Sequence, residues 1–394
     1  MRRIGLSLLA TLALTLAVGA PAASAAEGDH AVALGAYIPG SAEDPSLIDR
    51  YARLVGRKPV IVTYYKQWDF EPFVPRELDA IWSRGGVPMV TWEPQSYLGR
   101  SFSLRSIQRG RFDEYARRSA RAAAAWGLPI LVRFGHEMNG TWYPWARGVA
   151  GNNSYRLKAV WRRLVGIFRT QGADNVEWVW TPNVNTGGEF PFRDLYPGDA
   201  WVDWVGFDGF NWALRGEWNS FTDIVDNSYE EMAKISSRPM IVAETGSSQT
   251  GGDKAAWVAS ALRREIPKLD RIRAVVWFND KFEDEGAESG AGLDARVNSS
   301  RASLRALRSA AALPLYSLTR RQLLVTSSDL SAESAFAPDT PNSGFGQPSL
   351  FYRLTHKLHG QYVWLAVGVL VAAMLLLAAA ALLLGKRLRR RMAR

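Results

Sequence analysis

Two glutamates each follow an apolar run that is typical of a buried strand. Glu137 lies among aromatic residues in "VRFGHEMNGTWYPW" (132–145), and Glu244 lies in "MIVAETGS" (240–247). A carboxylate at such a place costs free energy unless it is hydrogen-bonded, or unless an altered pKa serves its chemistry. Cleavage of a glycosidic bond needs two carboxyl groups, one protonated acid and one ionised nucleophile. Either glutamate alone could equally be structural, but both together among many tryptophans favour this chemistry.

The other apolar runs end in residues of one character, namely aromatic rings, carboxylates and amides. These residues are Tyr37, Tyr64, Tyr65, Trp92, Glu93, Trp180, Asn183, Asp208, Trp277 and Asn279. Aromatic faces stack on sugar rings, and carboxylates and amides bind hydroxyl groups, so the pocket suits a neutral polyhydroxylated ligand. Trp92, Trp142 and Trp277 are the best cleft candidates among the tryptophans, because each lies at or just past a strand end.

The sequence argues against metal and cofactor chemistry. "HEMNG" (136–140) begins like the zinc motif H-E-x-x-H, but Gly140 stands where the second histidine would be. The expected folded body contains two histidines, His30 and His136, and the chain contains no cysteine. No G-x-G-x-x-G follows the first apolar run, and no P-loop occurs. We therefore expect no metal and no cofactor.

Eight apolar, β-rich runs predict the strands that position these residues. They are "AVALGAYI", "KPVIVTYY", "GVPMVTWE", "LPILVRFG", "NVEWVWTPN", "WVDWVGFDGF", "RPMIVAET" and "IRAVVWFN". Amphipathic stretches such as 112–126 and 154–169 separate most of them, although the segment between the fifth and sixth runs is short and irregular. Apolar runs alternating with helices indicate a parallel sheet covered on its outside. We predict an α/β fold, a (β/α)8 TIM barrel over residues 29–315, in preference to an open doubly wound sheet.

Both ends of the chain are typical of targeting segments. Residues 1–26 have the basic, apolar and small-residue order of a signal peptide cleaved after Ala25. Residues 362–385 are uncharged and long enough to cross a bilayer of about 30 Å, and the basic tail 386–394 should stay in the cytoplasm. Residues 316–361 are predicted to be a stalk and juxtamembrane linker. We therefore predict a single-pass protein of the cell membrane with its barrel outside the cell.

The net charge does not indicate a nucleic-acid partner. The formal charge is +10, but six basic residues follow Gly385 and two lie in the leader, which leaves about +2 for the exported body. The high isoelectric point therefore reflects topology. We expect a polysaccharide partner and membrane contact through the carboxyl-terminal helix, and no nucleic acid.

Several motifs resemble glycoside hydrolase family 26, whose members include β-mannanases and some β-glucanases and xylanases. "RFGHEMNGTWYPW" resembles the acid/base motif of that family, and "AETGS" resembles its nucleophile motif. Residues 196–212 and 277–300 resemble its sixth and eighth strand regions. The resemblance covers essentially all of residues 29–312 and implies a retaining glycosidase.

The resemblance also implies a role for each matching residue. Glu137 would be the acid/base, and Glu244 would be the nucleophile. The other matches are His136, Trp142 and Trp277 as sugar contacts, Asp208 as a substrate-contacting aspartate, and Arg133 and Asn139 as supporting residues.

One position departs from the family pattern. The family usually has D-x-Y on the sixth strand, where the tyrosine hydroxyl hydrogen-bonds the nucleophile, whereas this chain has Asp208, Gly209 and Phe210. Loss of that donor should weaken the positioning of Glu244 and reduce turnover, unless Tyr64 or Tyr65 supplies the bond.

These observations predict a membrane-anchored extracellular retaining endo-β-glycanase, with β-1,4-mannanase as the leading activity. Two alternatives stay open. One is a β-glucanase, or a trimming enzyme for the cell's own exopolysaccharide, which tethering to the cell favours. The other is a weakly active or inactive glycan-binding surface protein, for which Phe210 is the motivating feature.

Overall fold

The computed structural model describes residues 30–98, 100, 102–184, 190–213, 217–282 and 293–327. All of them belong to one compact unit of the chain. The predicted signal peptide, the transmembrane helix, the basic tail and the stalk after residue 327 lie outside the described residues. Among the described residues, no helix combines the length and the apolar character needed to cross a bilayer.

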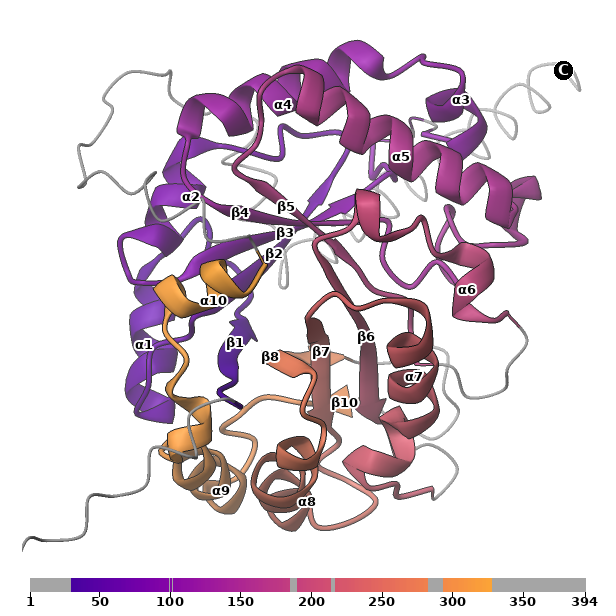
Figure 1. Cartoon of the computed structure of the whole chain (residues 1–394). Helices are drawn as coiled ribbons and strands as arrows, with labels where there is room; N and C mark the ends of the chain where they lie inside the picture. The colour runs from indigo at the N-terminus through magenta and orange to yellow at the C-terminus, as the bar shows by residue number, and fades with distance from the viewer. Residues whose placement is uncertain are drawn as a thin grey trace, which may run out of the picture. The chain divides into compact units, whose positions relative to one another are not determined.

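Eight parallel strands close into a barrel, as the eight apolar runs predict (Figure 1). Each strand pairs with the next one along the chain, and β8 pairs with β1 to close the ring. The strands are β1 Ala33–Tyr37, β2 Ile61–Gln67, β3 Val87–Glu93, β4 Ile130–Phe134, β5 Val176–Trp180, β6 Trp204–Asn211, β7 Met240–Ser247 and β8 Ile272–Phe278. The predicted (β/α)8 architecture is confirmed, and the open doubly wound alternative is excluded.

Helices cover the outside of the barrel, and the last of them covers one of its ends. They are α1 Ser46–Val55, α2 Pro75–Trp82, α3 Leu104–Gln108, α4 Asp113–Trp126, α5 Ser154–Thr170, α6 Phe192–Leu195, α7 Phe221–Ile235, α8 Lys254–Ser260, α9 Arg301–Ala311 and α10 Arg320–Ser327. Their limits follow local sequence signals. For example, α7 begins at a capping box made by Ser220 and Asp223, and α4 ends at Gly127 with φ of 75°.

The connection between β5 and β6 departs from the ideal pattern, as its irregular sequence predicts. In its described part it holds the one-turn helix α6 and a 3-10 turn at Asp199–Trp201 instead of a full covering helix. Phe192 and Leu195 of α6 are buried, so this short helix still covers part of the sheet.

Successive strand residues face two separate apolar regions. The barrel interior holds side chains such as Ile61, Met89, Leu131, Ile241 and Val276. The layer between the strands and the helices holds Val62, Val90, Val132, Val242 and Val275. Because neighbouring residues of a strand point to opposite faces, a shift of one position moves a side chain from the interior to the helical layer.

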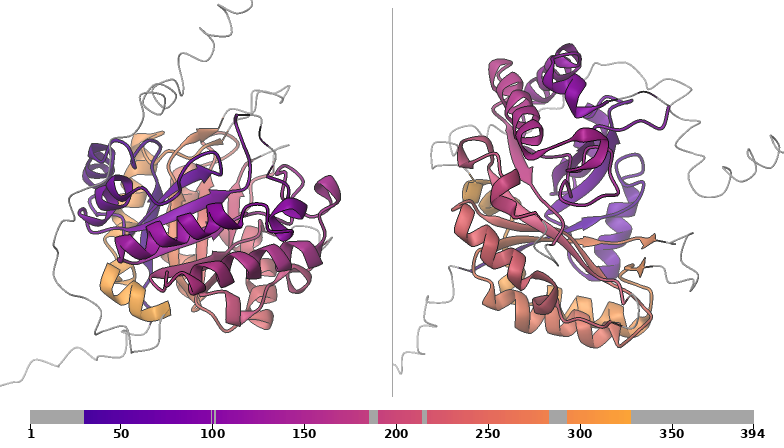
Figure 2. Two further views of the ribbon diagram at one scale, coloured as in Figure 1. Left: turned by 90° about the horizontal axis from the view of Figure 1, so that it is seen from above. Right: turned by 90° about the vertical axis from the view of Figure 1, so that its right-hand side faces the viewer.

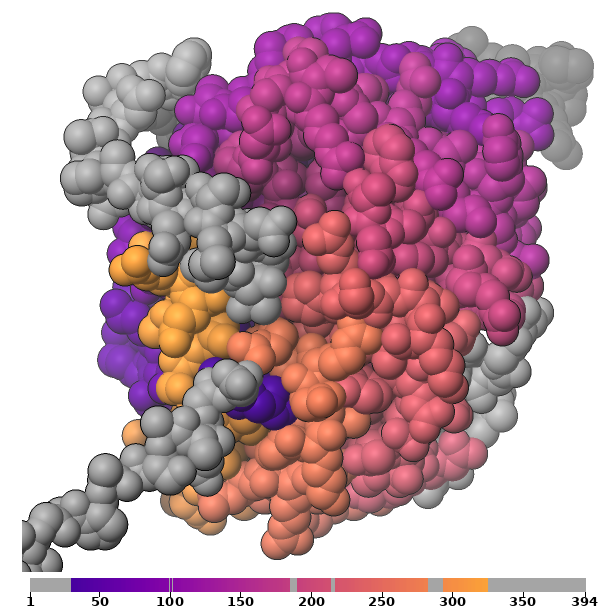
Figure 3. Space-filling model, in the orientation of Figure 1, coloured from indigo at the N-terminus to yellow at the C-terminus, as the bar shows by residue number. Residues whose placement is uncertain are grey.

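The folded body extends beyond the predicted boundary at residue 315. Leu318 and, on α10, Leu323 and Leu324 are buried against interior residues of the barrel. The backbone N–H of Val32 also donates to Leu315 at 2.7 Å. This segment lies beside β1 in the ribbon view (Figure 1), and its orange atoms lie next to indigo atoms from the start of the described chain in Figure 3. The first part of the predicted stalk therefore belongs to the fold, because its leucines cover one end of the barrel.

A short antiparallel ladder lies near the other end of the barrel. It is made by β9 Lys281–Phe282, which follows β8, and β10 Leu293–Asp294. Figure 2 shows these two strands at the opposite end from α10. The carboxyl ends of the barrel strands, where the candidate site residues cluster, lie on this side.

Candidate active site

A buried arginine joins two of the carboxylates that the sequence singles out. Arg133 on β4 donates from Nη1 to both carboxylate oxygens of Asp208 on β6, at 2.9 and 3.1 Å. Its Nη2 donates to Oε1 of Glu244 on β7, and its Nε donates to Oγ1 of Thr91 on β3 at 3.1 Å. Burial alone would lower the pKa of Arg133, but the two carboxylates raise it, so the guanidinium stays charged. One buried cation therefore fixes the position of two carboxylates.

Glu244 is held from a second side by a tyrosine. The hydroxyl of Tyr65, which lies on β2, donates to Oε1 of Glu244 at 2.5 Å. The pairing of β7 with β8 changes register between Val242 and Thr245. This irregularity lets Glu244 face the barrel although its neighbour Ala243 also belongs to the interior. Tyr65 of β2 and Arg133 of β4 therefore both hold the carboxylate of Glu244, which lies on β7.

Glu137 lies in the loop directly after β4, in a strained backbone conformation. Its φ is 50°, in the left-handed region that side chains rarely adopt, and its N–H donates to Thr181 at 2.9 Å. Its Oε2 accepts from Nε1 of Trp142 at 2.7 Å, and its Oε1 accepts from Nδ2 of Asn183 at 2.8 Å. Such strain persists only where the surroundings fix the residue, as these bonds do here.

Asn139 acts on Glu137 through a second asparagine. Its Nδ2 donates to the carbonyl oxygen of Asn183 at 2.9 Å, and its Oδ1 accepts from the N–H of Asn183 at 2.8 Å. Asn183 follows β5 and forms an isolated bridge with Asp208. The reciprocal pair therefore orients the amide that bonds Glu137, which fits the supporting role expected of Asn139.

The two glutamates lie in contrasting environments. Burial, together with the nearby charge of Glu244, raises the pKa of Glu137 to about 7, against the opposing hydrogen bonds from Asn183 and Trp142. Glu244 instead forms an ion pair with Arg133. Glu137 is therefore placed to retain its proton near neutral pH, while the carboxylate of Glu244 faces a buried cation. This is the division between acid and nucleophile that glycosidic cleavage requires.

His136 is a buried, neutral imidazole beside this pair. Its Nε2 lies 3.0 Å from the hydroxyl of Tyr143, whereas its Nδ1 has no hydrogen-bond partner among the described residues. Burial and the charge of Arg133 hold the pKa of His136 well below its usual range. Trp145 fixes the backbone by donating from Nε1 to the carbonyl oxygen of His136 at 2.7 Å. These contacts hold the ring in one orientation beside the two glutamates.

Trp142 presents an open ring at the edge of the site. Its side chain is 56% exposed although its Nε1 bonds Glu137. The ring lies so close to Gly140 that a Cβ there would come within 2.5 Å of it. Glycine at this position therefore permits the placement of Trp142, whose exposed ring fits the stacking role expected from the sequence.

Comparison with known proteins relates part of the chain to a family. The model of glycosyl hydrolase family 26 matches residues 107–259, which include both Glu137 and Glu244. This part of the chain matches glycosyl hydrolase family 26. The resemblance of the sequence motifs to this family is confirmed.

Two relatives are similar to this chain in sequence, and one solved structure is similar to it in fold. Endoglucanase H of Acetivibrio thermocellus is 35% identical over 286 residues, which cover 70% of this chain and 30% of that protein. A mannan endo-1,4-beta-mannosidase of Bacillus subtilis is 34% identical over 152 residues, which cover 36% of this chain and 38% of that protein. The chain thus spans only about a third of the length of these relatives. The catalytic domain of a family 26 endo-beta-1,4-mannanase from Bacillus sp. JAMB-750 shares the fold, with a TM-score of 0.56 at 16% identity, covering 74% of this chain and 88% of that chain.

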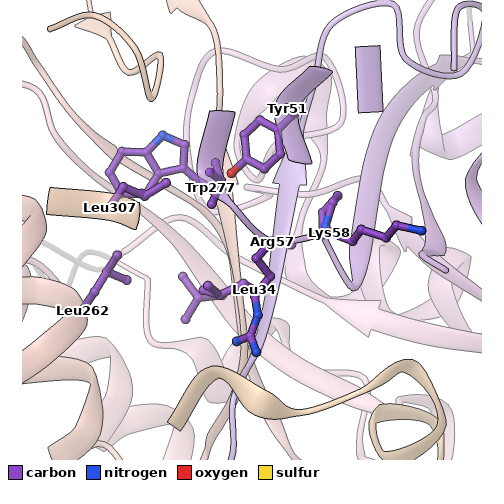
Figure 4. A pocket seen from close by; sticks show the side chains of 11 residues that line it. Leu34, Tyr51, Arg57, Lys58, Leu262, Trp277 and Leu307 are labelled. Atoms are coloured by element: carbon purple, nitrogen blue, oxygen red, sulfur yellow. The ribbon is translucent and has the colours of Figure 1, made fainter. Parts of the chain in front are cut away.

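Two tryptophans predicted for the cleft do not reach it. Trp92 is fully buried on the outer side of β3, where its ring lies 5.0 Å from that of Trp68. Trp277 is also buried and lines an apolar cavity with Tyr51 of α1 and Leu307 of α9 (Figure 4). The prediction that these two rings stack on sugars is wrong, because the pleat of each strand turns them toward the helices.

The residues that follow these tryptophans face the site instead. Phe278, next to Trp277, packs against Tyr37 with ring centroids 4.9 Å apart. Glu93, next to Trp92, is buried and accepts from Nε2 of Gln67 at 2.5 Å. Burial raises the pKa of Glu93 to about 7. The signal that could have identified Phe278 and Glu93 is the two-residue period of the strand.

The departure from the family 26 pattern at Phe210 is compensated. Tyr65 supplies the hydroxyl that bonds Glu244, whereas Tyr64 directs its hydroxyl to the carbonyl oxygen of Pro72 at 3.4 Å. Phe210 packs between Trp212 and Phe278. Phe210 is therefore no longer an argument for an inactive glycan-binding protein, because Tyr65 supplies the hydrogen bond to Glu244.

Replacing Tyr65 with phenylalanine should lower kcat without a comparable change in KM. A hydrogen bond to a charged group contributes about 1.5–3 kcal/mol, which corresponds to a loss of about ten- to a hundredfold in rate if it acts fully in the transition state. Phe210→Tyr serves as the matched control and should give no gain, because the position beside Glu244 is already filled. An unchanged kcat in Tyr65→Phe, or a large gain in Phe210→Tyr, would contradict this assignment.

Proposed function

We propose that this protein is a retaining endo-β-glycanase that acts on β-1,4-linked mannan, with Glu137 as acid/base and Glu244 as nucleophile. The contrast between the two carboxyl environments carries the proposal. Glu137 is bonded by the neutral donors Asn183 and Trp142 and has a raised pKa, while Glu244 is paired with Arg133. Inactivity or an inverting outcome would count against it.

The residues support a two-step reaction. Glu137 gives its proton to the glycosidic oxygen while a carboxylate oxygen of Glu244 attacks the anomeric carbon, so the leaving sugar departs and a glycosyl ester forms. Glu137, now ionised, takes a proton from water, whose oxygen attacks the anomeric carbon and releases Glu244. Arg133 and Tyr65 keep Glu244 oriented through both steps.

β-Glucan is the second candidate substrate, and a specific comparison favours it. Endoglucanase H matches this chain over 286 residues, whereas the mannan endo-1,4-beta-mannosidase matches over 152. Endoglucanase H is much longer than the matched part, so its name need not describe that part. Sugar epimers differ in the direction of one hydroxyl, and the choice between them depends on loop contacts at the cleft.

A substrate panel tests the activity and separates these candidates. Reducing ends are measured after incubation with β-mannan, mixed-linkage β-glucan and polysaccharide isolated from the producing cell. Release from mannan supports the proposal, and release from glucan or the cell's own polymer alone selects the alternative substrate. No release from any polymer, with retained binding in affinity electrophoresis, would instead establish a glycan-binding protein.

We also propose that the barrel is held outside the cell by a carboxyl-terminal membrane helix. The proposal is supported by the uncharged run 362–385, the basic tail 386–394 and the signal-like residues 1–26. Since α10 belongs to the body, the stalk should begin after Ser327.

Protease added to intact cells should release a soluble, active body by cutting within residues 328–349. The Ser-, Pro- and Gly-rich composition of this segment makes it the expected cleavage site. The released fragment is identified by its mass, and activity in the medium is compared with that of untreated cells. Retention of the body by cells after complete proteolysis, or protection of the body inside them, would disprove this topology.

A further inference from the structure

A continuous row of aromatic rings begins beside the nucleophile and ends at the surface. Its members, in order, are Tyr65, Tyr37, Phe278, Phe210, Trp212 and Phe282. The successive ring centroids lie 5.0, 4.9, 5.5, 5.4 and 6.3 Å apart. Tyr65 bonds Glu244, so the row is continuous with the candidate site. We call it the aromatic row.

The outer end of the aromatic row is exposed. Trp212 follows β6 and is 37% exposed, and Phe282 on β9 is 55% exposed. The two rings meet edge to face. Trp212 also packs on the half-buried ring of Phe210, which supports it from below. Two neighbouring exposed aromatic side chains on a rigid support are typical of a binding surface.

The aromatic row extends away from the acid/base. Glu137 and Trp142 lie in the loop after β4, whereas Phe278 ends β8 and Phe282 lies just beyond it. In the closed ring of eight strands, β4 and β8 are opposite each other. The acid donates its proton to the leaving group, so Trp142 marks the leaving-group side of the cleft. The aromatic row therefore lies on the side of the sugar that becomes attached to Glu244.

We propose that Trp212 and Phe282 form a distal subsite on the glycone side, where they stack on a sugar beyond the one being cleaved. The proposal rests on the proposed glycanase function and extends it from the reacting bond to substrate length. Flat aromatic faces recognise the C–H faces of a pyranose ring with little dependence on single hydroxyl groups. The subsite thus favours longer chains of either β-mannan or β-glucan.

This arrangement gives Phe210 a positive role. A tyrosine at this position would place a hydroxyl in the middle of the aromatic row, between Phe278 and Trp212. Tyr65 already provides the hydrogen bond to Glu244, so the hydroxyl is not needed there. Phe210 is then a support for the surface tryptophan rather than a defective catalytic tyrosine.

Aryl β-glycosides with one leaving group and two glycone lengths test the subsite. The wild type should cleave the tetrasaccharide glycoside with a higher kcat/KM than the disaccharide glycoside. Trp212→Ala and Phe282→Ala should each reduce that advantage by up to about tenfold, while the disaccharide rate changes little. Tyr155→Ala, which removes an exposed ring of α5 outside the aromatic row, should keep the advantage.

Binding gives a second readout that does not depend on turnover. Titration calorimetry of the Glu244→Gln protein with a hexasaccharide should show weaker affinity when Trp212→Ala is added, and unchanged affinity when Tyr155→Ala is added. Equal losses for both glycone lengths would show that Trp212 only supports the nucleophile and would overturn the subsite. If the variants lost activity or affinity only with substrates extended on the leaving-group side, the subsite would not lie on the glycone side. An inactive wild type that still binds through Trp212 would reject the glycanase function while retaining the subsite.

Discussion

Glu244→Ala should abolish hydrolysis of every substrate, because no nucleophile remains to form the glycosyl ester. Glu137→Ala should have a different defect. It should lose hydrolysis of natural polysaccharides, whose leaving group needs a proton, but keep the first step with an activated aryl glycoside. Burst kinetics on the aryl substrate measure that first step directly. Equal losses by the two variants on both kinds of substrate would refute the separate roles.

The pH dependence provides a further check on Glu137. Glu137 must be protonated to act as the acid, and its pKa is raised to about 7 by burial and by Glu244. Activity of the wild type should therefore fall as the pH rises through about 7. The Glu137→Ala protein acting on an aryl glycoside should lack this decline in its first step. The anomeric configuration of the first product, followed by NMR, should be retained, since inversion would mean that Glu244 activates water.

Arg133→Met should impair both stability and turnover. Arg133 is fully buried and bonds Asp208 and Glu244, so its loss leaves two buried carboxylates without their cation. Breaking a buried pair in this way costs about 3–5 kcal/mol of unfolding free energy. Urea denaturation measures that loss, and kcat on an activated aryl glycoside measures the loss of nucleophile positioning.

Two further variants separate the charge of Arg133 from its geometry. Arg133→Lys keeps a cation but cannot bond Asp208, Glu244 and Thr91 at once, so it should recover part of the stability and little of the turnover. Asp208→Asn leaves the pair of Arg133 with Glu244 and should keep more turnover than Arg133→Met. An Arg133→Met protein with the same unfolding free energy as the wild type would contradict the expected stabilising role of Arg133 toward Asp208 and Glu244.

The sequence was sufficient to predict the barrel and the positions of Glu137 and Glu244 near its strand ends. Eight apolar runs alternating with amphipathic stretches define the architecture, and Glu137 and Glu244 lie where such runs end. Which face a residue takes was harder to predict. Both faces of these strands are apolar, so the sequence pattern does not show which alternate residues face the barrel interior and which face the helices. The sequence therefore places Trp92 and Trp277 in the cleft, although in the structure Glu93 and Phe278, one position later, face the site.

Other features depend on closure of the sheet. Tyr65 and Glu244 are 179 positions apart in the chain, and only the ring of strands brings the hydroxyl to the carboxylate. The register change in β7 lets both Ala243 and Glu244 face inward, which a regular two-residue period does not predict. The end of the body was also misplaced at residue 315, because the leucines of α10 precede the Ser- and Pro-rich segment by only a few residues.

The left-handed backbone conformation of Glu137 lowers the stability of the fold, although the proposed activity requires this residue. A non-glycine residue in such a conformation costs of order 1–3 kcal/mol, and Glu137 also buries a carboxyl group there. Glycine would adopt the same backbone without that strain. We therefore expect selection for thermal stability alone to replace this residue and yield a more stable but inactive barrel, a result that thermal melting of Glu137→Gly can check. Directed evolution of this protein for heat resistance would need an activity screen at every round.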